Sequence, residues 1–90
     1  MQFMVIEHFK NRDAKPVYRR LRDAGWLMPE GLVYVSSWVA LDFARCFQIL
    51  ECDDRKLLEQ WMENWNDLVD FEVVPVQTSA QARAAIEPLL

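Results

Sequence analysis

Four segments of the chain carry hydrophobic patterns that predict β-strands. Residues 2–9 form a nearly continuous apolar run, which is typical of a buried strand. Residues 32–40 alternate between apolar and polar, and a short turn separates them from a strand-like run at residues 44–52, so a hairpin is expected. Residues 68–76 form the last strand. Pro75 places that strand at a sheet edge, because proline has no backbone N–H to donate.

Apolar positions at helical spacing predict a first helix after the first strand. Asp13 is expected as its N-cap, Pro16 is tolerated in its first turn, and Gly25 is expected just after its end. A loop over residues 26–31 then leads to the second strand. The apolar stripe of this helix consists of Ala14, Val17, Tyr18, Leu21 and Ala24.

A second helix is expected after the hairpin, with either Asp53 or Asp54 as its N-cap. Asn66 is expected to end it in the left-handed backbone region. Thr78 and Gln81 fit a capping box, which predicts a short terminal helix. The apolar stripe of the second helix, for which core packing is expected, consists of Leu57, Leu58, Trp61, Met62 and Trp65.

The resulting order of elements is βαββαβ followed by a helix. This is the split βαβ, ferredoxin-like arrangement, an α+β fold with a four-stranded antiparallel sheet. Right-handed crossovers place both long helices on one face of the sheet. The chain has room for one such domain, residues 1–90, and a domain of this size has a limited core. The other face of the sheet is left uncovered and must be solvated, bind a ligand or meet another sheet.

Strand alternation predicts which side chains face the helices and which lie on the uncovered side, here called the open face. Both sides of the first strand are apolar, so the facing of Glu7 and His8 stays undecided, with Glu7 favoured for the open face. Expected toward the helices are Val33, Val35, Val39, Phe47 and Ile49. Expected on the open face are Tyr34, Ser36, Trp38, Cys46, Gln48, Leu50 and Cys52.

An open face that carries Tyr34, Trp38 and Leu50 is too apolar to be left in water. The composition agrees, because 52% of the residues are hydrophobic and four Trp and five Phe are many for a small monomer. A second copy packed sheet against sheet would cover this face, so a homodimer is expected. The net charge of −4 argues against binding to nucleic acid or to an anionic membrane surface.

Five segments that run through almost the whole chain carry a family resemblance: MVIEHFK, YVSSWV, CFQILEC, WMENW and DFEVVPV. Together they resemble the dimeric α/β-barrel superfamily, which contains muconolactone-isomerase-like enzymes and the cofactor-free monooxygenases of antibiotic biosynthesis. The closer resemblance is to a small bacterial family of unknown function in that group. It implies two four-stranded sheets facing each other in a dimer, with any ligand pocket between sheet and helices or inside the barrel. It implies no particular reaction, since the superfamily hosts many.

Glu7 is the strongest candidate for chemistry, because a carboxylate within an apolar strand is costly to bury without a partner. It is either a base with a raised pKa or a structural group that is hydrogen-bonded to Tyr34, Trp38 or Gln48 or paired with an arginine. Together with Glu7, these three residues are predicted to line a ligand site. His8, the only histidine, is the other catalytic candidate, although a polar residue near a strand end is the simpler interpretation.

Some superfamily enzymes that this chain resembles combine a His with Asn and Trp for haem or quinol chemistry. His8, Trp38, Asn64 and Asn66 are present, but no sequence spacing brings them together. No cofactor and no metal site is predicted.

Cys46 and Cys52 are the only cysteines and lie six residues apart. On one strand that separation is about 20 Å, whereas a disulfide needs Cα atoms about 4.4–6.8 Å apart. The two thiols therefore cannot bond to each other or share one metal. Small apolar side chains on a packed face are expected, with an intersubunit thiol contact as the alternative.

Two other functions of this topology lack their motifs. An acylphosphatase needs a glycine-rich, arginine-bearing loop after the first strand, and residues 10–16 contain no glycine. An RNA-recognition module needs patterned aromatic residues on the first and third strands and a basic face. The basic cluster between Lys10 and Arg22 is expected to be a solvated helix face. The N-terminal segment resembles neither a signal peptide nor a membrane span, so a cytoplasmic location is expected.

Three functions stay open. A module that binds a small apolar or aromatic ligand, without assigned catalysis, is favoured. The alternative is a cofactor-free isomerase or monooxygenase acting on a small aromatic or lactone-like substrate, with Glu7 or His8 moving protons. An assembly role would require no pocket.

Overall fold

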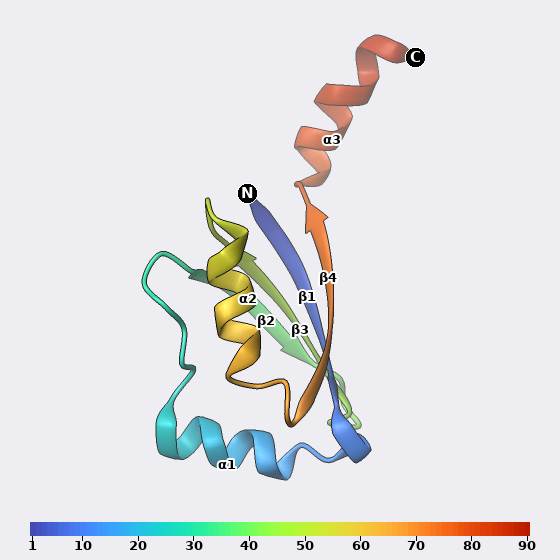
Figure 1. Ribbon diagram of the computed structural model, residues 1–90. Coiled ribbons are helices and arrows are strands. Elements are labelled where there is room, and N and C mark those ends of the chain that lie inside the picture. The colour runs from blue at the N-terminus through green and yellow to red at the C-terminus, as the bar shows by residue number, and fades with distance from the viewer.

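The computed structural model describes residues 1–90 and contains four strands and three α-helices (Figure 1). In chain order they are β1 (Gln2–Phe9), α1 (Lys15–Ala24), β2 (Val33–Val39), β3 (Arg45–Glu51), α2 (Arg55–Glu63), β4 (Val69–Val76) and α3 (Ser79–Ile86), with single 3-10 turns at Lys10–Arg12 and Glu87–Leu89. The strands form one antiparallel sheet in the order β2-β3-β1-β4. This order confirms the predicted α+β, ferredoxin-like topology, with Pro75 on an edge strand as expected.

Local interactions at its two ends explain where helix α1 begins and where it ends. The Asp13 carboxylate accepts a hydrogen bond of 3.0 Å from the backbone N–H of Lys15, while Ala14 occupies the N-cap position, one residue later than predicted. Pro16 lies in the first turn, where its missing N–H breaks no helical bond. Gly25 ends the helix with φ of 75°, a conformation that glycine adopts without a steric penalty.

The other two helices begin with side-chain caps. The Asp54 carboxylate accepts a hydrogen bond of 2.9 Å from the backbone N–H two residues on, so Asp54 rather than Asp53 is the N-cap of α2. The capping box of Thr78 and Gln81 is confirmed at the start of α3. Helix α2 ends at Glu63, before the predicted end at Asn66.

The side of the sheet that faces the helices is defined by the buried positions of β1 and β3. These are Phe3, Val5, Glu7 and Phe9 in β1 and Cys46, Gln48 and Leu50 in β3. Glu7 therefore faces the helices and His8 lies on the open face, so the facing favoured from sequence is wrong. The predicted facing of β3 is also wrong, because Phe47 and Ile49 lie on the open face, and Cys52 is buried in the core. The two faces are almost equally apolar, so hydrophobicity alone did not show which one is buried. The hydrogen bond between Glu7 and Gln48 offsets the free-energy cost of burying both side chains on the helix side.

Strand β2 contains an irregularity between Tyr34 and Ser36, where its pairing with β3 shifts by one residue. Residues directly opposite each other in antiparallel strands share a face. Tyr34 is opposite Leu50 and therefore faces the helices, contrary to the prediction, and Val33 moves to the open face. Trp38 pairs with an open-face residue of β3 and lies where it was predicted. Regular alternation cannot anticipate an extra residue of this kind.

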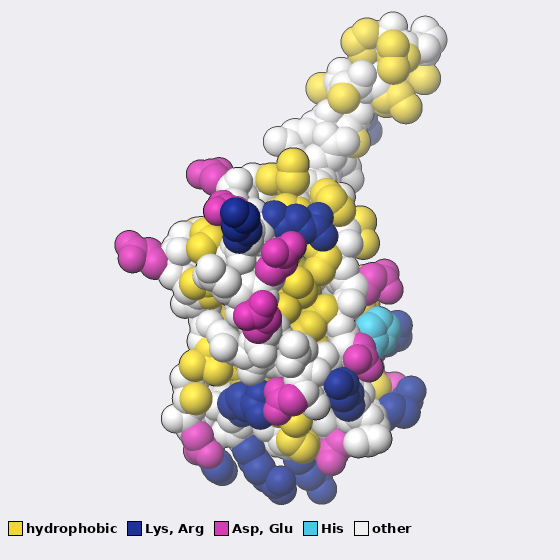
Figure 2. All heavy atoms as spheres, viewed as in Figure 1, with side chains coloured by type: hydrophobic (Ala, Val, Ile, Leu, Met, Phe, Trp, Pro, Cys, Tyr) yellow, Lys and Arg dark blue, Asp and Glu magenta, His cyan; other side chains and the backbone are white.

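One core joins α1 and α2 to the sheet, and its largest fully buried side chains include Trp61, Leu50 and Leu58. Helix α3 projects from the end of β4 away from that core (Figure 1). Hydrophobic side chains gather at its far end, and Lys and Arg gather around α1 (Figure 2). None of the helices combines the length and the apolar character needed to span a membrane.

Candidate functional site

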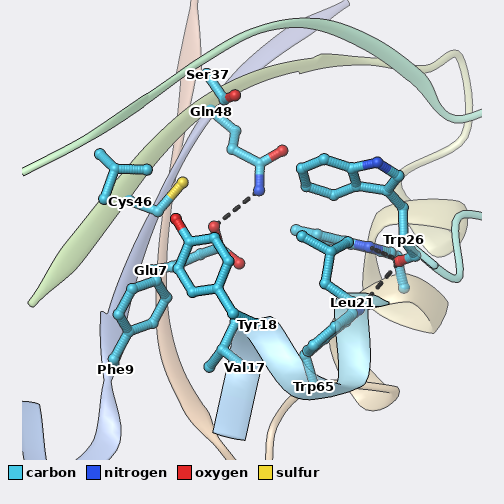
Figure 3. Close-up of a pocket in the computed structure, with 12 residues that line it drawn as sticks. Glu7, Phe9, Val17, Tyr18, Leu21, Trp26, Ser37, Cys46, Gln48 and Trp65 are labelled. Carbon is cyan, nitrogen blue, oxygen red and sulfur yellow. Dashed lines mark hydrogen bonds between the residues drawn. The ribbon is translucent and has the colours of Figure 1, made fainter. Parts of the chain in front are cut away.

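A cavity of about 230 Å³ lies between the helix-facing side of the sheet, helices α1 and α2, and the loop that follows α1 (Figure 3). We call it the Glu7 pocket. Nine of its twelve lining residues are hydrophobic. The lining residues are Glu7, Phe9, Val17, Tyr18, Leu21, Trp26, Ser37, Val39, Cys46, Gln48, Trp61 and Trp65.

The polar centre of the pocket is a buried pair from two neighbouring strands. Gln48 Nε2 donates a hydrogen bond of 2.7 Å to Glu7 Oε2. Glu7 is 5% exposed and Gln48 is 1% exposed. Burial raises the pKa of Glu7 above its ordinary value, and the hydrogen bonds with Gln48 and Cys46 oppose that rise without cancelling it. The carboxyl group therefore holds its proton to a higher pH than an exposed glutamate does.

The thiol of Cys46 lies next to this carboxyl, because Cys46 and Glu7 are directly opposite each other in the sheet. Burial raises the pKa of Cys46 far above its usual value, and the negative charge of Glu7 raises it further. Thiolate is the nucleophilic form of cysteine, so this side chain is not an activated nucleophile. Cys46 and Cys52 are both free and buried, on the helix side of the sheet.

Three tryptophans form an aromatic wall opposite the polar pair. The indole N–H groups of Trp61 and Trp65 both donate to the backbone carbonyl of Trp26, at 3.0 and 3.1 Å. Asn64 adds a hydrogen bond of 3.2 Å from its side-chain amide to the carbonyl of Leu27, the next residue of the same loop. These bonds hold the loop after α1 against the end of α2, where it closes one side of the pocket.

Tyr18 closes the pocket from α1 (Figure 3). Its pKa is raised by burial and also by the nearby Cys46 and Glu7. The phenol therefore stays neutral at physiological pH and lies close to the polar pair. Tyr18 was predicted only as part of an apolar helical stripe, so its place at the pocket was not foreseen.

The structure brings together only part of the site predicted from sequence. Glu7 and Gln48 meet in the pocket. Tyr34 lies beside it, with its ring centroid 6.0 Å from that of Trp26 and its hydroxyl 2.8 Å from Ser37 Oγ. Trp38 is 72% exposed on the open face and does not line the pocket.

His8 also lies away from the pocket, on the open face, where its Nε2 is 3.9 Å from a carboxylate oxygen of Glu72. Both side chains are about half exposed. His8 is therefore not placed to exchange protons with a molecule bound beside Glu7. No group of three or more His, Cys, Asp or Glu side chains is arranged to hold a metal ion.

Several of the basic residues around α1 contact surface carboxylates. Arg20 forms a bidentate pair with Asp67, with N–O distances of 2.7 and 2.6 Å. Arg12 pairs with Asp42 at 3.0 Å. These exposed ion pairs agree with the interpretation of a solvated helix face.

The fold and the pocket define a class: an α+β protein of ferredoxin-like topology with a buried carboxyl–amide pair between its sheet and its helices. A family described as Domain of unknown function (DUF3303) matches residues 1–90, and the chain belongs to this family. No curated protein and no solved structure matches the chain.

Proposed function

We propose that the protein binds a small apolar or aromatic molecule in the Glu7 pocket. The observation that carries this proposal is the pocket itself: an aromatic-lined cavity of about 230 Å³ with one buried polar pair, Glu7 and Gln48. Ligand sites in proteins are typically concave and mostly apolar, with a few polar groups that orient the ligand. A side-chain core without function would gain stability by filling such a space.

A cavity-filling substitution tests this proposal. Leu21→Trp places a larger side chain into the pocket from α1, and the same substitution at Leu41, which is 99% exposed, is the matched control. We expect small molecules that co-purify with the wild-type chain, identified by mass spectrometry after denaturation, to be lost from Leu21→Trp and kept by Leu41→Trp. Equal retention by both variants would contradict a ligand site at this position.

We further propose that the chain forms a homodimer through its open face, as in the dimeric α/β barrels that its sequence resembles. In support, this face carries Met4, Ile6, Phe47 and Ile49 in its centre and an exposed Trp38 toward its edge. An apolar surface of this kind gains stability when a second copy covers it. Light scattering at micromolar concentration should give twice the chain mass, and a monomer mass would refute the dimer.

The raised pKa of Glu7 favours one alternative, a cofactor-free isomerase or monooxygenase acting on a small aromatic or lactone-like substrate. Glu7 would then act as the base, because a carboxyl with a raised pKa is better matched to proton transfer near neutral pH. Any turnover found in a substrate screen should be lost in Glu7→Gln and partly kept in Glu7→Asp. Unchanged turnover in Glu7→Gln would remove Glu7 from the reaction and with it this alternative.

A further inference from the structure

One fully buried polar atom of the Glu7 pocket has no hydrogen-bond partner. Gln48 is 1% exposed, and its Oε1 atom accepts no hydrogen bond. A buried acceptor left unpaired is costly, and almost all buried polar atoms in folded proteins have a partner. We therefore expect a hydrogen-bond donor from outside the chain to bind at this atom.

The direction of this acceptor is fixed by the other end of the same amide. Gln48 Nε2 donates to Glu7 Oε2 at 2.7 Å, so Oε1, on the other branch of the planar amide, points away from that carboxylate. Figure 3 shows it pointing toward Trp26, across the pocket from Glu7. A donor placed between the polar pair and the tryptophans would lie on the side to which this oxygen points, and a small shift of the Gln48 amide would let the two atoms meet.

The remaining lining restricts the charge of the ligand. No Lys, Arg or His side chain lines the pocket, whereas Glu7 contributes a carboxyl group. An anionic ligand would have to lose its hydration without gaining a cationic partner, which is strongly unfavourable. Aromatic carboxylates and phosphates are therefore poor ligands for this site.

The aromatic wall offers surface but few hydrogen bonds. The indole N–H groups of Trp61 and Trp65 are already used by the carbonyl of Trp26. These side chains present rings against which a flat apolar molecule can stack or pack edge to face. Among the fully buried polar side-chain atoms of the pocket, only Gln48 Oε1 is left without a partner, so it is the atom with the most to gain from a directional contact.

We propose that the ligand of the Glu7 pocket is a neutral, planar aromatic molecule that carries an N–H or O–H donor and gives that hydrogen bond to Gln48 Oε1. This inference rests on the proposed function, since it names the chemical class of the ligand bound there. The ring of the ligand packs against the tryptophan wall, and its N–H or O–H group supplies the missing hydrogen-bond partner of Gln48 Oε1. Indole-like and phenol-like molecules satisfy both conditions.

Calorimetric titration of the full chain with isosteric probes tests the proposal. Indole has an N–H donor, benzofuran replaces it with an oxygen acceptor, and indene has neither. We expect indole to bind at least about tenfold more tightly than either isostere, which is the effect of one hydrogen bond to a buried, otherwise unpaired acceptor. Benzofuran-2-carboxylate, as the anionic probe, should not bind measurably.

The variant Gln48→Met keeps the length of the side chain and removes the acceptor. Because the single variant also frees Glu7 Oε2 to accept the indole N–H, the test uses the double variant Glu7→Leu/Gln48→Met, which should bind indole and indene with equal affinity. If this variant does not fold, the ratios measured on the wild-type chain still decide the proposal.

Equal binding of indole and indene to the wild-type chain would overturn the donor requirement and leave the proposed function standing. Tighter binding of benzofuran or of the carboxylate would overturn the ligand class in the same way. Failure of all four probes to bind would contradict the proposed function and the ligand class together.

Discussion

The two faces of the sheet have similar apolar content but different polar chemistry. The helix side encloses Glu7 and Gln48, which are almost inaccessible to solvent and bonded to each other. The open face carries His8, which is about half exposed, and Trp38, which is largely in contact with solvent. Burial raises the pKa of Glu7, and His8 Nε2 lies 3.9 Å from a carboxylate oxygen of Glu72 at the surface. This difference is the reason for proposing a small-molecule site on the helix side and a contact with a second copy on the open face.

The largest expected contrast is between tryptophans on the two faces. Trp61→Ala removes a side chain that is 1% exposed and should lower the free energy of unfolding by about 3–5 kcal/mol. Trp38→Ala should not change the circular dichroism spectrum, which shows that the chain is folded. It should reduce the molecular mass measured by light scattering from that of a dimer toward that of a monomer. If Trp38→Ala lost folded structure as Trp61→Ala does, Trp38 would belong to the core, which would contradict its proposed place in a dimer interface.

Removal of the Gln48 amide should have the next largest effect on stability. Gln48→Leu leaves the buried Glu7 carboxyl without its amide donor, which should cost about 1–3 kcal/mol in urea unfolding at neutral pH. The matched control is Gln60→Leu on the exposed side of α2, expected to stay within about 0.5 kcal/mol of the wild type. Equal effects of the two substitutions would show that the buried pair does not matter for stability.

The pH dependence of stability provides a test specific to Glu7. Its pKa in the folded chain is raised by burial above the ordinary value of 4.5. Below pH 4.5 the group is protonated in both states, and its contribution to stability is fully present. As the pH rises through the folded-state pKa that contribution is lost, because the unfolded chain releases the proton more readily. Glu7→Gln should therefore gain stability relative to the wild type between about pH 4 and neutral pH, and a constant difference would contradict the raised pKa.

The smallest effect is expected for α3. Ile86 at the end of the helix and Leu89 in the turn that follows are both exposed, and the helix extends away from the core (Figure 1). Removal of residues 79–90 should change the free energy of unfolding of the remaining domain by no more than about 0.5 kcal/mol. A larger loss, measured by urea unfolding on both chains, would mean that α3 contacts the core in solution.

The topology was predictable from sequence because it depends on periodicity and local caps. Strands β1 and β4, the cap at Asp54 and the capping box at Thr78 each follow from short-range patterns. The choice of face in β1 and β3 was not predictable in the same way, because both faces are apolar. Only the pairing of Glu7 with a residue 41 positions away distinguishes them.

The site was predictable in part, for related reasons. Glu7 and Gln48 stand out as polar residues within apolar strands, which was the signal that identified them. Trp26 lies in a loop and reaches the pocket through bonds from the distant Trp61 and Trp65, so no local pattern marks it. The shift near Tyr34 is set by its pairing with β3 and also leaves no pattern in the sequence.

The most direct test of the pocket uses the four tryptophan side chains as reporters of the two faces. Trp26, Trp61 and Trp65 line the Glu7 pocket, and Trp38 lies on the open face. Each indole N–H gives one nuclear magnetic resonance signal in a ¹⁵N-labelled chain, assigned by single substitutions. On titration with indole we predict that the signals of the three pocket tryptophans shift in a saturable way while that of Trp38 does not. Shifts confined to Trp38 would place the ligand on the open face and contradict the account.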